Sequence, residues 1–150
     1  MKYSISEVAD IIGVAPSTIR FYDKKGLLPS IGRTDGGIRR FTEADLEWLR
    51  IIECLKTSGM ALSDIQKYIH LALEGDSSIG ERYELIESQM KSIENQITAL
   101  SEIRDILAYK SWYYKTSMEA GTVSVHENDT EADVPKKLRP VYLKLRNIVK

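Results

Sequence analysis

Apolar residues recur at helical spacing in the first part of the chain, between residues 5 and 12. Ser4 stands three residues before Glu7, the spacing of a capping box that begins a helix. Pro16 suits the first position of a second helix, and Gly26 suits the position just past its end. The pattern therefore predicts two short helices joined by a turn at residues 13–15.

Two further helices follow in the pattern. Thr42 and Asp45 form a second capping-type start, and Leu46, Leu49, Ile52 and Leu55 then repeat at helical spacing up to about Ser58. A fourth helix is predicted from about Leu62 to near Gly75, with an apolar face that includes Ile65 and Ile69. These two helices would complete the core on which the first two are mounted.

Residues 79–118 carry a different pattern, in which apolar residues alternate at steps of four and three. No glycine or proline occurs from residue 81 to residue 120, and a sustained repeat of this kind is typical of a coiled coil. A stripe of that length needs a partner, and a second copy of the chain is the simplest one. The residues predicted to form the dimer contact are Ile86, Met90, Ile93, Ile97, Leu100 and Leu107.

The C-terminal residues 121–150 allow two interpretations. Leu138, Tyr142, Leu145 and Val149 would lie on one face of a docking helix, whereas Val141, Leu143 and Leu145 would alternate along a strand. The acidic, polar stretch before Pro135 has the composition of a disordered segment.

The second helix and the segment that follows it carry a local excess of basic residues. From residue 16 to residue 40 there are six Lys or Arg and two Asp or Glu, on a chain of net charge −1. A Gly-rich turn at residues 35–37 predicts a β-hairpin, and a basic hairpin beside a basic helix is a winged helix-turn-helix pattern. The alternative is a solvated basic loop. The residues predicted to contact double-stranded DNA are Ser17, Thr18, Arg20, Tyr22 and Lys24 of the helix, and Arg33, Arg39 and Arg40 of the wing.

The composition of the chain argues against a membrane protein, a metal-binding protein and an enzyme. The chain has 150 residues, 43% hydrophobic and 29% charged, which is globular composition, and it has no apolar run long enough to cross a bilayer. We therefore expect it in the cytoplasm, without membrane contact. One cysteine and two histidines make a soft-metal site improbable, and no phosphate loop or hydrolytic constellation is visible. We expect no metal, no cofactor and no enzymatic activity.

Four blocks in order give a resemblance to the MerR family of bacterial transcription regulators. They are Ile5–Ala9, Thr18–Asp23, Gly26–Leu28 and Arg39–Phe41, and the likeness runs from about Lys2 to Gly75. Two departures are visible: Phe21 stands where the family often has Tyr, and Ala15 and Ala61 stand where it usually has a Ser or Thr helix cap. Each alanine would cost about 0.5–2 kcal/mol of local stability.

The resemblance implies a mainly α fold, in which a winged helix-turn-helix head is followed by a long dimerisation helix. The domains would be residues 1–75 for DNA binding, 76–120 for an antiparallel coiled coil, and 121–150 as a C-terminal tail. A homodimer would distort promoter DNA to control transcription, with RNA polymerase as a further partner. Alternatives are an architectural or excisionase-like DNA-bending protein, and a coiled-coil adaptor whose head binds protein.

Cys54 has two interpretations. Free cysteine is often a small buried hydrophobe, and the third helix offers such a position. Alternatively, Cys54 followed by Gly59-Met60 and Glu74-Gly75-Asp76 resembles the thiol-dependent MerR branch that responds to aldehydes or nitrosative stress. A helix C-terminus disfavours a thiolate, while Arg50 one turn earlier favours it. Residues 121–150 are too few for a separate drug-binding domain.

Overall fold

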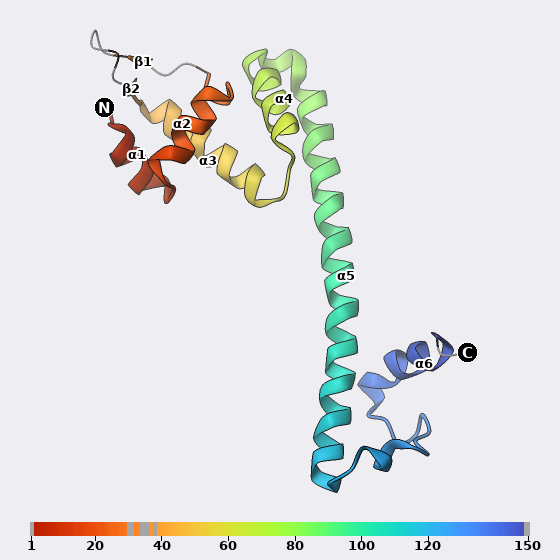
Figure 1. Ribbon diagram of the computed structural model, residues 1–150. Coiled ribbons are helices and arrows are strands. Elements are labelled where there is room, and N and C mark those ends of the chain that lie inside the picture. The colour runs from red at the N-terminus through yellow and green to blue at the C-terminus, as the bar shows by residue number, and fades with distance from the viewer. Residues whose placement is uncertain (1, 30–31, 34–36, 38, 149–150) are drawn as a thin grey trace. The chain divides into compact units, whose positions relative to one another are not determined.

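The computed structural model describes residues 2–29, 32–33, 37 and 39–148. It is mainly helical and divides into two compact units, residues 1–92 and 93–150. Figure 1 labels the elements. The predicted mainly α fold, with a long helix after a small helical head, is confirmed.

The first unit contains two helix pairs with a small hairpin between them. The α1–α2 pair comes first, the hairpin strands follow, α3 packs against α1 and α4 packs against α3. A 3₁₀ turn at Gly75–Ser78 then leads into the long helix α5. The bounds are α1 Ile5–Ile12, α2 Pro16–Lys24, β1 Gly32–Arg33, β2 Arg39–Arg40, α3 Glu43–Thr57, α4 Leu62–Leu73 and α5 Ile79–Ala120.

Local sequence signals set these helix ends. The Ser4–Glu7 and Thr42–Asp45 capping boxes are both formed, so each side-chain pair satisfies otherwise unpaired N–H groups at a helix start. Pro16 occupies the start of α2, and Gly26 follows its end with a φ of +69°, a left-handed conformation that glycine adopts without steric cost. Ala15 and Ala61 precede α2 and α4 without any side-chain cap, as the sequence predicted.

The apolar stripes of α1 to α4 meet in one core. Val8, Ile19, Leu27, Phe41 and Leu49 are completely buried, and Trp48 packs against this cluster while remaining partly exposed. Phe41 follows β2 directly and forms an antiparallel backbone bridge with Tyr3. Burial of Phe41 therefore anchors the base of the hairpin to the core beside α1.

The second unit is built on the C-terminal part of α5. After Ala120 come two 3₁₀ turns, η2 (Val123–His126) and η3 (Lys136–Leu138), and then helix α6 (Arg139–Ile148). The helical interpretation of residues 138–145 is confirmed and the strand is wrong; Val149 lies outside the described residues. The expected disorder before Pro135 is also wrong, because Val134 is buried and His126 is held by several contacts.

An aromatic cluster explains why this segment is folded. The His126 ring stacks on Tyr113 at 4.2 Å between centroids and lies 5.1 Å from Trp112, while Tyr142 of α6 lies 6.2 Å from Tyr109. His126 Nδ1 is 2.7 Å from an Asp129 carboxylate oxygen, and the Tyr142 hydroxyl donates to the Asp129 carbonyl at 2.7 Å. Short-range patterning could not show the pairings with α5, since they join residues 10 or more positions apart.

Membrane-spanning and metal-binding features are both missing from the part of the chain that the structure describes. No helix there is long and apolar enough to cross a membrane. No group of three or more His, Cys, Asp or Glu residues in those same ranges could hold a metal ion.

Candidate nucleic-acid interface

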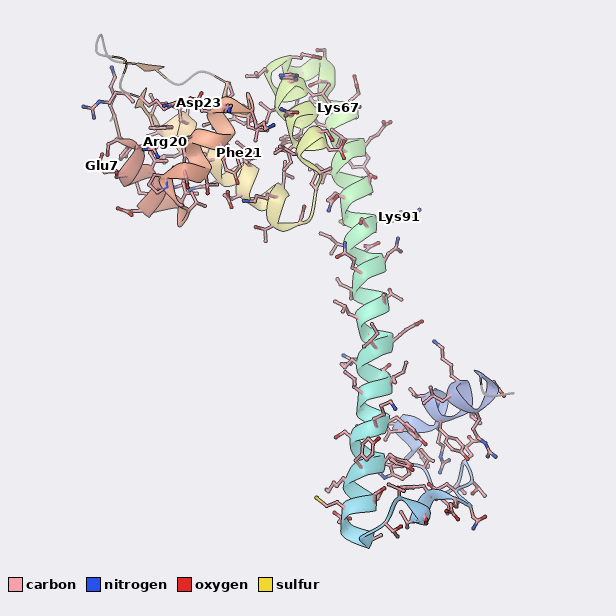
Figure 2. All side chains as sticks on the ribbon, in the orientation of Figure 1. Glu7, Arg20, Phe21, Asp23, Lys67 and Lys91 are labelled. Carbon is pink, nitrogen blue, oxygen red and sulfur yellow. The ribbon has the colours of Figure 1, made fainter. Side chains whose placement is uncertain are left out.

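Helix α2 has one buried face and one exposed face. Ile19 and Tyr22 point into the core, whereas the residues on the other side are open to solvent. Figure 2 labels Arg20, Phe21 and Asp23 along this helix. The exposed residues are Ser17, Arg20, Phe21, Lys24 and Lys25, and Thr18 is partly exposed. Two hydroxyls and two cations are thus available on one short helix, with a third cation, Lys25, just past its end, and these groups suit contacts to phosphates and base edges.

The structure corrects the prediction for Tyr22. Only 1% of this residue is exposed, so its ring is part of the core and cannot lie against DNA in this conformation. Its hydroxyl donates to Glu53 of α3 and accepts from Lys56 Nζ at 2.9 Å. Burial raises the pKa of Tyr22, and the hydrogen bond to Glu53 raises it further, against a smaller lowering by Lys56. The signal was in the sequence, because Tyr22 follows buried Ile19 at helical spacing.

The wing is tied to α2 by an ion pair. β1 and β2 are antiparallel, with Gly32 opposite Arg40 and Arg33 opposite Arg39. Arg39 reaches Asp23 near the end of α2, with Nε at 2.6 Å and a terminal guanidinium nitrogen at 2.5 Å from the same carboxylate oxygen. Both side chains are less than a third exposed. Sequence reasoning placed Arg39 on the wing but did not predict that it would hold the wing to the helix.

The other two arginines predicted on the wing, Arg33 and Arg40, lie on opposite strands of the hairpin. Arg40 is exposed on β2, and Arg33 lies in β1. Of the predicted turn, Gly37 is described with a φ of +77°, whereas Asp35 and Gly36 lie outside the described residues. Arg40 is therefore an exposed cation of the wing, next in the strand to Arg39, which contacts α2.

Two contacts from outside the helix-turn-helix fix the end of α2. Gln66 of α4 donates from Nε2 to the Lys25 carbonyl at 2.6 Å. The Lys25 ammonium lies 5.7 Å from the centroid of the Phe21 ring, a cation–π geometry. Gln66 had no visible signal in the sequence, because its partner lies far away along the chain.

Cys54 is exposed on α3. The interpretation of this residue as a buried hydrophobe is therefore wrong. The buried residues of α3 include Leu46, Leu49, Ile52 and Leu55, and helical spacing puts Cys54 on the opposite side, one turn after the exposed Arg50.

The predicted dimer stripe on α5 is exposed over most of its length. Among its members, Met90 is 47% exposed, Leu100 is 65% exposed and Leu107 is 59% exposed; Ile93 is partly exposed. In the second unit, residues 126–145 cover another face of the helix, through Tyr109, Tyr113 and the buried Ser117. The folded C-terminal segment thus leaves Leu100, Leu107, Tyr114 and Met118 uncovered.

The buried core, the exposed basic helix and the attached hairpin define the class of this protein as a winged helix-turn-helix protein. Two family models match it: "MerR HTH family regulatory protein" over residues 3–71, and "MerR, DNA binding" over residues 46–109. The chain belongs to the MerR family of transcriptional regulators, which are not enzymes.

Individual relatives agree with this assignment. An HTH-type transcriptional regulator of Haemophilus influenzae is 43% identical over 123 residues, which is 82% of this chain and 91% of the relative. The crystal structure of HiNmlR, described as a MerR family regulator lacking the sensor domain and bound to promoter DNA, is similar with a TM-score of 0.74 and 41% identity, covering 90% of this chain and all of that one. A MerR family regulator from Listeria monocytogenes has a TM-score of 0.72 and 30% identity, covering 79% of this chain and 90% of that one.

Proposed function

We propose that this regulator binds promoter DNA as a homodimer and distorts it to control transcription. The observation that carries the proposal is the exposed basic face of α2 with the wing attached beside it through Arg39 and Asp23. The promoter-bound state of a relative that matches 90% of this chain supports the same function. Family membership does not favour the architectural protein or the protein-binding adaptor.

In this proposal the head makes two kinds of DNA contact. Arg20 and Lys24, with the hydroxyls of Ser17 and Thr18, contact DNA from α2. Arg33 and Arg40 contact the flanking phosphates from the wing. Arg39 contributes by holding the wing in place, and Tyr22 supports the helix from inside the core. Counterion release at each phosphate contact would make binding weaken steeply with salt.

The dimer would form through the exposed stripe of α5. Burial of apolar surface contributes roughly 25 cal/mol per Å², so a stripe of large apolar side chains is a strong driving force for pairing. We infer an antiparallel pairing of residues 76–120 with residues 1–75 as the DNA-binding part and residues 121–150 as an appended segment. RNA polymerase at the promoter is the further partner, and the cytoplasm, where bacterial promoters lie, is the place of action.

The DNA-binding proposal is tested with operators selected from randomised duplex DNA by the wild-type protein. Arg20→Ala should weaken binding by about tenfold, as expected for one lost contact of 1–3 kcal/mol. Lys91→Ala is the matched control, because it removes an exposed cation from α5 rather than from the head (Figure 2). Equal affinity of Arg20→Ala and Lys91→Ala would contradict the proposal.

The dimer is tested by placing charge in the stripe. The double substitution Ile93→Glu and Ile97→Glu should give a monomer by light scattering, because carboxylates from both chains would be buried in the pairing. The matched control is Asn95→Glu with Ala99→Glu, which adds the same charge at the same spacing on the other side of the exposed helix. A wild-type protein that is monomeric at micromolar concentration would overturn the dimer.

We also propose that Cys54 is a thiol sensor, as in the aldehyde- and nitrosative-stress branch. Its exposure on α3 supports this, since an electrophile can reach it. Cys54→Ser keeps the size and removes the nucleophile. The variant should bind the operator normally and lose induction by aldehydes in a reporter strain. Full induction in the variant would return Cys54 to an ordinary surface position.

A further inference from the structure

Gln89 joins the long helix α5 to the end of α3. It lies in α5 within the first compact unit, where its side chain is partly buried. Its Nε2 donates to the Ser58 carbonyl at 2.6 Å. Ser58 is the residue that ends α3, and Gly59 turns the chain away with a φ of +83°.

The Gln89 side chain provides a hydrogen-bond donor for a backbone carbonyl at the C-terminal end of α3. The last carbonyls of an α-helix have no partner within the helix and carry the negative end of its dipole. At the end of α3, the Gln89 N–H donates a hydrogen bond to such a carbonyl and places a partial positive charge at the negative end of the dipole. Within the first unit, the bond therefore fixes the N-terminal part of α5 to one defined point of the head.

The same end of α3 is connected to α2, the helix that carries the proposed DNA contacts. Lys56 and Glu53 lie in the last turns of α3, and both contact the hydroxyl of Tyr22. Tyr22 is one of the two buried residues of α2, and it follows the exposed Arg20 and Phe21 on that helix. A short series of hydrogen bonds thus runs from α2 through the last turns of α3, which Gln89 caps from α5.

Gln89 also adjoins the surface that would pair with a second copy. The next residue, Met90, is 47% exposed and belongs to the apolar stripe, as does Ile86 three residues earlier. We propose that Gln89 is a positioning residue that sets the angle between each head and the dimerisation helix, and so determines the half-site spacing that the dimer accepts. This inference rests on the proposed promoter-binding dimer.

The dependence of operator affinity on half-site spacing would report whether Gln89 holds each head at a fixed angle. Adding one base pair between half-sites rotates one of them by roughly 35° about the duplex axis. A rigidly held head can follow that rotation only by deforming the DNA, at a cost that depends on the spacer. A head released from α5 follows it more easily, so its affinity depends less on spacing.

The experiment measures operator affinity on duplexes whose spacer is one base pair shorter, unchanged or one base pair longer. The wild type should prefer one spacer by about tenfold or more, in line with the cost of deforming DNA. Gln89→Met has a side chain of similar length without the N–H, and it should reduce this preference at least threefold. Gln89→Lys restores a donor and should restore the preference. Lys91→Met on the same helix is the control and should behave as wild type.

The outcomes are separable. A wild-type spacer profile in Gln89→Met, with the dimer intact by light scattering, would overturn the role of Gln89 and leave the proposed function standing. A monomeric wild type would overturn the proposed function, and this inference with it. A dimeric wild type that binds the operator without a spacer preference would overturn this inference alone. Should Gln89→Met fail to fold, Gln89→Glu, which is isosteric but has no N–H, gives the same test; an unchanged profile there would equally reject the role.

Discussion

Arg39 on the wing and Asp23 near the end of α2 form a short ion pair that is largely withdrawn from solvent. Two guanidinium nitrogens contact the same carboxylate oxygen, so the pair joins the wing to the helix. Together with the buried Phe41 and its bridge to Tyr3, this contact fixes the wing relative to α2.

The first prediction concerns that pair. Arg39→Ala and Asp23→Ala should each lower the free energy of unfolding by about 1 kcal/mol, the value typical of a partly screened charge-assisted contact. If Arg39 acts by holding the wing, each variant should weaken operator binding to a similar extent. The double variant should then be no weaker than either single one. A further loss from Arg39→Ala in the Asp23→Ala background would show that Arg39 contacts DNA itself.

Tyr22→Phe gives the second prediction. The substitution keeps the buried ring and removes the hydroxyl that Glu53 and Lys56 contact. Loss of these hydrogen bonds should lower the free energy of unfolding by about 0.5–1.5 kcal/mol, measured by urea denaturation. Operator affinity should change much less than in Arg20→Ala. A large loss of affinity with unchanged stability would place Tyr22 at the DNA after all.

The helix boundaries of the head were predictable because their causes are local. A capping box, a proline at the first helical position and a left-handed glycine each act within four residues, as at Ser4, Pro16 and Gly26. The exposed positions of α2 followed from the same patterns, apart from Tyr22. The Tyr22 hydroxyl suits a DNA contact, but the helical spacing from Ile19 places this side chain in the core.

The C-terminal unit was not predictable in the same way. Its order depends on the aromatic residues Tyr109, Trp112 and Tyr113, which follow helical spacing on α5 but meet their partners only after the chain turns back. Composition alone therefore indicated disorder before Pro135. The Gln66–Lys25 and Gln89–Ser58 contacts were missed for a related reason, because a polar side chain on a helix gives no sign of which distant carbonyl it will reach.

The third prediction is a pH dependence at the start of α1. Hydrogen bonds from Ser4, backbone first and then side chain, hold the pKa of Glu7 below its ordinary value. A lowered pKa means that the charged form stabilises the fold above the ordinary value of about 4.3, and that this contribution is lost as the pH falls through the folded-state value. The side-chain amide introduced by Glu7→Gln can accept the same bonds but cannot titrate.

The unfolding free energy of Glu7→Gln should therefore fall less than that of the wild type between pH 6 and pH 3, or about that range. Glu47→Gln, which removes an exposed carboxylate from α3, is the control. Parallel pH profiles for the wild type and Glu7→Gln would contradict the role of the capping carboxylate.

The fourth prediction concerns His126. The ring packs into the cluster with Tyr113 and Trp112, and its removal leaves the Asp129 carboxylate without this partner. His126→Ala should loosen the C-terminal unit by about 1–3 kcal/mol. In a Trp48→Phe background the fluorescence of Trp112 should shift to the red as water reaches the ring. His70→Ala, on the exposed side of α4, should leave the emission unchanged. An unshifted spectrum in His126→Ala would show that the cluster does not hold the segment.

Promoter binding by a dimer paired through α5 is decided by the mass of the protein–DNA complex on a selected operator, determined by sedimentation at micromolar protein. We expect two chains bound to one duplex for the wild type. The combined Ile93→Glu and Ile97→Glu variant should lose this complex, while the Asn95→Glu and Ala99→Glu control should retain it. A complex with a single chain on the duplex, or an equal mass for the stripe variant and its control, would contradict the claim that a dimer paired through α5 binds the promoter.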